Sequence, residues 1–254
     1  MTEPFLVHAH IPKTGGSALN QRFLFPRFGQ DRVQMLYRYV FEAAHRLPKR
    51  HTSPAMRCFA ATGHVPYGFF SRVYPSATYL SVFREPLARS LSFLNFVLAT
   101  PDHKVHERIG ADPARNAADD PDGFVMAVLQ EPRLATVQSN VQTRLASGCA
   151  RLGEMPVDAL HLDVAEANMA RSDYLIGDQA QLARLIGELR SRYPIPHQQA
   201  PTPQPDPRTE KRLPKTLRVD ALAPATVAAL EQANRFDLAL YEQIQARSAN
   251  LAAA

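Results

Sequence analysis

The sequence predicts an α/β fold in which a central parallel sheet is flanked by helices within a single domain. Four short apolar segments have the length and composition of buried strands, namely residues 5–11, 57–62, 78–84 and 173–177. Helical patterns separate these segments, and strands that alternate with helices pair in parallel. With 254 residues the chain can bury one sizeable core, so we expect residues 1–254 to form one domain.

The first strand leads into a glycine-containing turn. FLVHAHI (residues 5–11) precedes the turn, and the helix-compatible segment Ala18–Phe25 follows it. The turn consists of Pro12, Lys13, Thr14, Gly15, Gly16 and Ser17. In a strand–turn–helix unit the free backbone N–H groups and the helix dipole attract an anion, and a lysine adds positive charge. The turn therefore predicts a phosphate-like ligand and a P-loop-like fold.

The order of residues in this turn differs from that of a Walker A loop. A Walker A loop reads G-x-x-x-x-G-K-[ST], with the lysine after the glycines. Lys13 instead precedes Gly15 and Gly16, and no glycine occupies the first Walker position. A P-loop kinase is an alternative interpretation, but no aspartate at a strand end is a convincing Mg²⁺ ligand. Taken alone, the turn is also compatible with an ordinary β-turn-α connection that carries a surface lysine.

A second motif follows the strand ATYLSVF. Arg84 and Glu85 turn the chain, and Pro86 suits the first position of a helix. Arg84 is therefore expected at the carboxyl end of a strand, the edge at which open α/β sheets bind ligands, and Ser92 about two turns into the next helix. The planar guanidinium of arginine can hold phosphate oxygens in a bidentate way. For Arg84 alone, a surface salt bridge with Glu85 is the alternative.

Together the two motifs resemble those of the sulfotransferases that use 3′-phosphoadenosine 5′-phosphosulfate (PAPS). In that family a loop P-K-T-G-[GST]-[ST] binds the 5′-phosphosulfate, and R-[DE]-P-x-x-R-x-x-S binds the 3′-phosphate. Within that family, the sequence resembles the carbohydrate sulfotransferases that are similar to heparan sulfate 2-O-sulfotransferase. It resembles a soluble bacterial member of that branch. The resemblance implies that Arg84 and Ser92 hold the 3′-phosphate, with Glu85 where the family more often has aspartate.

His64 is the candidate catalytic base. It lies in GHV, at the end of the short strand between the two motifs, and in the same branch a Gly-His-[VF] histidine deprotonates the acceptor. A neutral imidazole can take the proton of a weakly nucleophilic hydroxyl at working pH. Relatives often have a second histidine two residues earlier, where this chain has Thr62. His8 and His10 lie in the first strand and are expected to be buried and hydrogen-bonded.

These assignments imply a mechanism and its substrates. PAPS is the expected donor, with Lys13 neutralising the leaving phosphate, Thr14 and Ser17 donating hydrogen bonds, and His64 activating the acceptor for in-line attack. No metal is expected. The acceptor is a hydroxyl compound, most naturally a glycan or glycolipid, but a small alcohol or a tyrosine hydroxyl presents the same O–H group. A protein that binds a nucleotide or sulfated glycan without catalysis is a third alternative.

Composition excludes several other functional classes. The formal charge of +5 and the pI of about 9.4 suit a polyanionic ligand. Nucleic acid is not expected, because the basic residues are scattered and are not interleaved with aromatic ones. The sequence contains no run of eighteen or more apolar residues, so we expect no transmembrane span. The N-terminus lacks the build of a signal peptide, and two cysteines make no disulfide framework, so we expect a cytoplasmic location. The sequence does not indicate the oligomeric state.

The remaining elements are assigned from periodicity and breaker residues. We expect the nucleotide-binding core at about 4–100, and acceptor loops with packing helices at about 101–248. Loops are expected at 101–123 and 194–218, and helices at 31–47, 67–74, 123–131, 136–147, 157–171, 178–193 and 224–248. NVQTRLASG, in the fourth of these helices, resembles a signature of bacterial family members. Its Arg144 is either a contact for nucleotide or acceptor or an exposed helical arginine.

Overall fold

The computed structural model describes residues 5–36, 59–100, 117–149, 156–194 and 217–253, which contain one five-stranded sheet. The strand order is β2-β3-β1-β4-β5, and all four neighbouring pairs are parallel. The strands are β1 Leu6–Ala9, β2 Val33–Met35, β3 Ala60–Gly63, β4 Thr78–Phe83 and β5 Tyr174–Asp178. The predicted α/β fold with a central parallel sheet is confirmed. Its last strand comes from far beyond residue 100.

The three inner strands are covered on both faces. Every residue of β1, β3 and β4 is buried, whereas the edge strands β2 and β5 are partly exposed. Parallel sheets need this two-sided cover because their crossover connections put helices on both faces. The near-continuous apolar runs that predicted these strands reflect that double burial.

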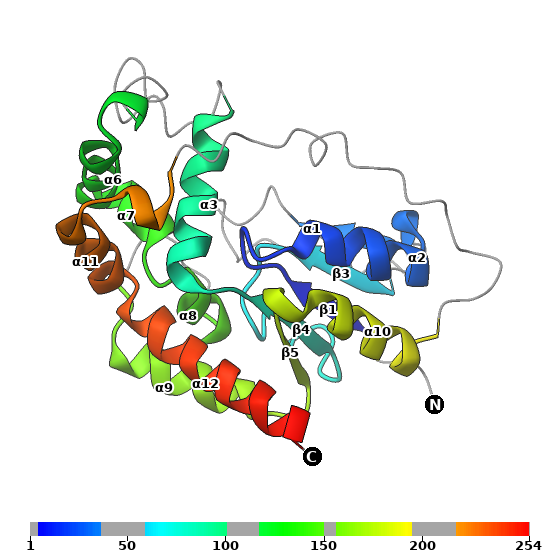
Figure 1. Ribbon diagram of the computed structural model, residues 1–254. Helices are drawn as coiled ribbons and strands as arrows, with labels where there is room; N and C mark the ends of the chain where they lie inside the picture. The colour runs from blue at the N-terminus through cyan, green and yellow to red at the C-terminus, as the bar shows by residue number, and fades with distance from the viewer. Residues whose placement is uncertain (1–4, 37–58, 101–116, 150–155, 195–216, 254) are drawn as a thin grey trace.

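One face of the sheet is covered by the first helical segment and by α10, which lie side by side in Figure 1. The segment runs without interruption over residues 16–28 and contains a π-helical turn, so the predicted helix Ala18–Phe25 is confirmed. Its parts are α1 Gly16–Leu19, η1 Asn20–Leu24 and α2 Phe25–Phe28, and α10 is Leu182–Arg192. Phe23 and Leu185 pack against Leu6 and Leu80 of the sheet.

The opposite face is covered by three helices from the second half of the chain. They are α8 Val141–Ala146, α9 Ala159–Met169 and α12 Arg235–Ala253. Their side chains, such as Leu145, Met169 and Leu240, form one cluster with Val7 and Tyr79 of the sheet. The sheet is therefore the middle of three layers.

A third cluster extends the fold beyond the sheet along α3, as Figure 1 shows. Leu91 and Leu94 of α3 pack there against Phe124 and Leu230. The helices involved are α3 Pro86–Leu98, α6 Pro121–Gln130, α7 Pro132–Gln138 and α11 Pro224–Ala233, and short 3₁₀ turns occur at Gln30–Arg32, Gln179–Gln181 and Val219–Ala221. No helix in the described ranges is both long and apolar enough to cross a membrane.

Two predicted helices are wrong where the structure describes them. Residues 33–35, within the helix expected at 31–47, form the edge strand β2, where Met35 is 51% exposed. Val33 pairs there with Ala60 of β3, a long-range contact that local periodicity does not reveal. Residues 67–74 form successive turns, in which Gly68 adopts φ 78°. Residues 37–47 lie outside the described ranges.

Two other predicted helices are interrupted. The segment 136–147 contains the end of α7 and all of α8, with a break at Asn140. The segment 224–248 is divided at Asn234 into α11 and α12. Both breaks occur at residues whose side chains accept hydrogen bonds from the backbone of a distant segment, which local periodicity cannot reveal. Residues 101–116 and 195–216, from the two predicted loops, lie outside the described ranges.

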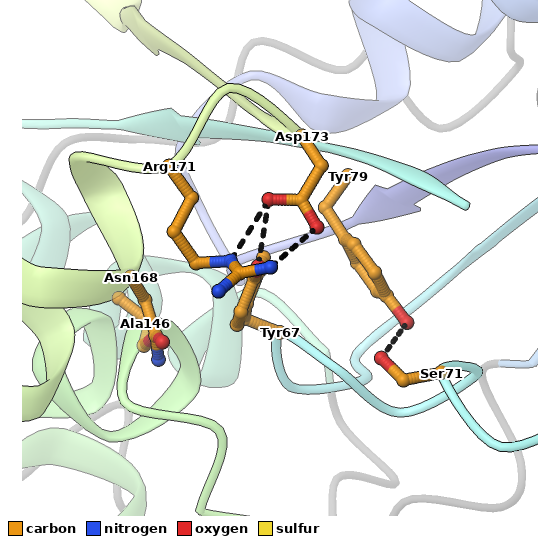
Figure 2. A network of polar contacts seen from close by, with 7 residues as sticks. All are labelled: Tyr67, Ser71, Tyr79, Ala146, Asn168, Arg171 and Asp173. Atoms are coloured by element: carbon orange, nitrogen blue, oxygen red, sulfur yellow. Dashed lines mark hydrogen bonds and ion pairs between the residues drawn. The ribbon is translucent and has the colours of Figure 1, made fainter. Parts of the chain in front are cut away.

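A polar network ties the turns after β3 to the start of β5, and Figure 2 shows it from close by. The Tyr67 hydroxyl donates to Asp173 Oδ1 at 2.9 Å, and the Arg171 guanidinium contacts the same carboxylate at 3.0 Å. Burial and the bond to Asp173 raise the pKa of Tyr67 to about 12. The Tyr67 ring also stacks on Tyr174 with centroids 4.6 Å apart. The network holds the chain between β3 and β4 against the second half of the protein.

We expect Tyr67→Phe to lower the free energy of unfolding by about 1 kcal/mol, because it removes one partly exposed, charge-assisted hydrogen bond. Because the folded-state pKa lies above the unfolded value near 10, this stabilisation is present at lower pH and declines as the pH rises toward 12. Urea denaturation at neutral pH measures the change. Tyr74→Phe is the control, because the structure gives the Tyr74 hydroxyl no hydrogen bond among the described residues. Equal losses in the two variants would contradict the assignment.

Candidate active site

Three adjacent strands deliver the predicted site residues to one edge of the sheet. The turn 12–17 follows β1, His64 follows β3 and Arg84 follows β4. Since β1 lies between β3 and β4 and both pairings are parallel, all three strands end on the same side. β1 connects to β2 on one side of the sheet, whereas its neighbour β4 connects to β5 on the other, and ligands bind at such a switch point in α/β sheets.

The turn after β1 exposes the amino end of the helical segment 16–28. Lys13 and Gly15 have left-handed backbone conformations, with φ 70° and 92°. The first backbone N–H bonded within the helix is that of Leu19, which donates to the Gly15 carbonyl at 3.1 Å. No side chain caps this helix start, where Ser17 is exposed. The free N–H groups and the helix dipole thus make a site for an anion.

Contacts within the protein hold this turn in shape. The Thr14 hydroxyl donates to the Ile11 carbonyl at 2.8 Å, and its side chain is fully buried. Thr14 was expected to donate its hydroxyl to the ligand, but in the structure that hydroxyl braces the turn. Gly16 lies so close to the His10 ring that a Cβ atom there would be 2.1 Å from His10 Cδ2. The turn therefore depends on a glycine at position 16.

The Lys13 ammonium lies over the ring of Phe96, 4.4 Å from its centroid. Burial and the nearby Arg84 guanidinium lower the pKa of Lys13. Phe96 is on α3, one turn after Ser92, and both side chains are partly buried. α3 thus brings a predicted phosphate ligand and an aromatic contact for the lysine to the same region. Sequence reasoning missed Phe96, since no local pattern relates it to residue 13.

Arg84 connects the second motif to the first. Its Nη1 donates to the Lys13 carbonyl at 3.0 Å across 71 residues of sequence. Glu85 does not form a simple surface pair with Arg84. Its carboxylate instead accepts from the Leu87 N–H at 2.9 Å and caps α3. Burial lowers the pKa of Arg84, and the Glu85 charge opposes that shift. Glutamate or aspartate at position 85 therefore has a local structural reason.

The proton on His64 is assigned by its hydrogen bond. His64 Nδ1 is 2.7 Å from the His10 carbonyl oxygen, which can only accept, so in the neutral ring Nδ1 carries the hydrogen. Nε2 is then the acceptor atom of the ring. Burial lowers the pKa of His64, and the bond to His10 opposes that shift. A neutral imidazole with a defined acceptor nitrogen has the form that a general base requires.

His10 and His8 form a buried row with His64. Ring centroids are 4.9 Å apart between His10 and His64, and 5.1 Å between His8 and His10. His8 Nδ1 contacts Asn20 Oδ1 at 2.7 Å and Thr62 Oγ1 at 3.0 Å. The expectation that His8 is buried and hydrogen-bonded is confirmed. Sequence reasoning noted the absence of a histidine at position 62 but missed that His10 lies beside His64.

Burial keeps these rings uncharged. It lowers the pKa of His8 to about 4, and it holds the pKa of His10 well below its usual range with the help of the neighbouring histidines and Lys13. The positive charge at this edge therefore comes from Lys13 and Arg84, and the histidines add polarity without charge.

Arg144 is enclosed within the protein. Its side chain is 1% exposed on α8 and donates a hydrogen bond to Cys149, and burial lowers its pKa. An exposed helical arginine does not fit a side chain so enclosed. A contact of Arg144 with nucleotide or acceptor stays a prediction. The residue of the same segment that reaches the site is Gln142, whose amide bonds both the N–H and the carbonyl of Arg84.

Comparison with models of protein families and with curated proteins finds no match for this sequence. The assignment of the candidate site therefore depends on the geometry of its own residues. Within the described ranges, no group of three or more His, Cys, Asp or Glu side chains is arranged to hold a metal ion. What the geometry establishes is a cationic turn, an arginine bonded to it and a neutral histidine, all at one edge of a parallel sheet.

We expect Gly16→Ala to destabilise the protein by about 1–3 kcal/mol, because the added methyl group overlaps the buried His10 ring. The measurement is the free energy of unfolding by chemical denaturation. Gly187→Ala in α10 is the matched control, since a Cβ atom there meets nothing within 4 Å. The control should be neutral or gain up to about 1 kcal/mol from helix propensity. A Gly16→Ala variant as stable as this control would show that His10 does not pack on the turn as described.

Proposed function

We propose that this protein is a sulfotransferase that moves the sulfonate of PAPS to a hydroxyl acceptor on a glycan or glycolipid. The observation that carries the proposal is the hydrogen bond from Arg84 Nη1 to the Lys13 carbonyl. It joins the two motifs that resemble the 5′-phosphosulfate loop and the 3′-phosphate motif of one family. A nucleotide with phosphates at both positions needs two neighbouring anion sites.

The donor is an anion, and positively charged groups and N–H donors bind it. The N–H groups at the start of helical segment 16–28 and the Lys13 ammonium bind the 5′-phosphosulfate, with the exposed Ser17 hydroxyl beside them. Arg84 and Ser92 bind the 3′-phosphate. Support comes from the lowered pKa of Lys13, because burial and the nearby Arg84 destabilise its charge and an arriving anion would stabilise it.

The transfer step follows from the positions of the base and the lysine. His64 Nε2 takes the proton of the acceptor hydroxyl while the oxygen attacks the sulfur of PAPS. The new O–S bond forms as the bond from sulfur to the 5′-phosphate oxygen breaks. The products are the sulfated acceptor, 3′-phosphoadenosine 5′-phosphate and a protonated His64, and Lys13 neutralises the charge on the leaving phosphate. A cytoplasmic location, expected from the sequence, is part of this proposal.

The first test is nucleotide binding by isothermal titration calorimetry. We expect 3′-phosphoadenosine 5′-phosphate to bind roughly 10- to 100-fold more tightly than AMP, because Arg84 and Ser92 contact only the 3′-phosphate. We expect ATP to bind more weakly than the bisphosphate. Tighter binding of ATP would favour a kinase and overturn the proposal. Tight bisphosphate binding without turnover on any acceptor would favour the protein that binds without catalysis.

The second test concerns His64 and uses transfer from radiolabelled PAPS to a panel of glycans, glycolipids and small alcohols. We expect His64→Ala to lower turnover by about 10²- to 10⁴-fold, the usual contribution of general base catalysis, and to leave bisphosphate affinity almost unchanged. Lys13→Ala should lower both turnover and nucleotide affinity, because the ammonium contacts the donor itself. A His64→Ala enzyme with normal turnover would remove His64 from the mechanism.

The pH profile supplies an independent check on His64. Only the unprotonated ring can accept a proton, and burial lowers the pKa of this histidine from its ordinary value of 6.5. The midpoint of the acid-side decline in activity should therefore lie below pH 6.5. A decline centred above pH 6.5 would contradict this assignment.

A further inference from the structure

The helices α8 and α12 meet at their amino ends, and each caps the other. Asn140, at the start of α8, accepts from the Phe236 and Asp237 N–H groups at 2.9 and 3.1 Å. In return, the Asp237 carboxylate accepts from the Gln142 and Thr143 N–H groups at 3.1 and 2.7 Å. Asn140 adopts a left-handed conformation with φ 49° to make this contact.

The charge of Asp237 is fully buried between these helix ends. Burial raises its pKa, while the nearby Arg89 guanidinium and the hydrogen bonds from the α8 backbone favour the charged form. A carboxylate at the amino end of a helix is also favoured by the helix dipole. The first turn of α8 is thus attached to α12 by backbone hydrogen bonds and charge.

This attachment sets the position of Gln142, in the first turn of α8. The Gln142 side chain is 1% exposed, and its amide pairs with the Arg84 peptide in both directions. Gln142 Oε1 accepts from the Arg84 N–H at 2.9 Å, and Nε2 donates to the Arg84 carbonyl at 2.8 Å. The backbone pairing of β4 with β5 ends at Phe83, so the side-chain amide continues the pairing by one residue.

We infer that Gln142 is a positioning residue for recognition of the 3′-phosphate. It does not contact the nucleotide itself. It holds the Arg84 peptide, and the Arg84 guanidinium, already bonded to the Lys13 carbonyl, is thereby oriented toward the donor site. A continuous series of hydrogen bonds runs from Asp237 through Gln142 and Arg84 to the turn. This inference rests on the proposed function.

The test measures affinities for 3′-phosphoadenosine 5′-phosphate and for AMP by calorimetry in a set of variants. Loss of two hydrogen bonds to the Arg84 peptide should weaken bisphosphate binding roughly tenfold or more in Gln142→Leu, with AMP affinity within about twofold of the original. Gln142→Glu keeps the acceptor for the Arg84 N–H but loses the donor to its carbonyl, so an intermediate loss is expected. If Gln142→Leu does not fold, Gln142→Glu tests the inference by itself.

Two controls separate positioning from general destabilisation. Thr143→Val removes the 2.8 Å bond from the neighbouring hydroxyl to Asp237 and leaves the Gln142 amide in place, so it should lower stability but not the bisphosphate-to-AMP ratio. In an Arg84→Ala background, Gln142→Leu should cause no further loss of that ratio, because a residue that acts through Arg84 has nothing left to position.

The inference is overturned if Gln142→Leu and Gln142→Glu keep the original affinity ratio, if Thr143→Val loses it equally, or if the losses from positions 84 and 142 add. These outcomes differ from a failure of the proposed function. In that case the unmodified protein itself would not prefer the bisphosphate to AMP.

Discussion

The pairing of β1 with a parallel neighbour on each side is the constraint on which the site depends. Leu6 lies opposite Ala60 of β3 and Thr78 of β4, so the three strands run in register and end on the same side of the sheet, with β4 extending furthest, to Phe83. Three segments far apart in sequence then leave the sheet at the same place. Their meeting is a property of the backbone, and the side chains decide only what chemistry occurs there.

The charge at that edge of the sheet depends on which of its ionisable side chains are charged and which charges have a partner. Lys13 and Arg84 lie close enough that the arginine lowers the pKa of the lysine. The neighbouring carboxylate of Glu85 is occupied by the start of α3, and the histidines are held neutral by burial. The edge therefore keeps a positive charge that suits a polyanionic ligand.

Sequence patterns predicted what is local and missed what is long-range. The turn 12–17, the strand before it and the helix from Pro86 follow from residues adjacent in sequence, and a parallel sheet implies that Lys13, His64 and Arg84 share an edge. The contacts of Phe96, His10 and Gln142 could not be predicted, because each depends on packing between segments that no local pattern relates. The same holds for the break at Asn234, since that residue accepts a hydrogen bond from Asn140 on a different helix.

The reciprocal caps of α8 and α12 have a consequence for how the protein is made. Asp237 lies 95 residues after Gln142, so the hydrogen bonds to the first turn of α8 can be completed only late in translation. The turn after β1, His64 and Arg84 all emerge much earlier and can assemble around the central strands. Until Asp237 is synthesised, the Gln142 and Thr143 N–H groups lack this acceptor.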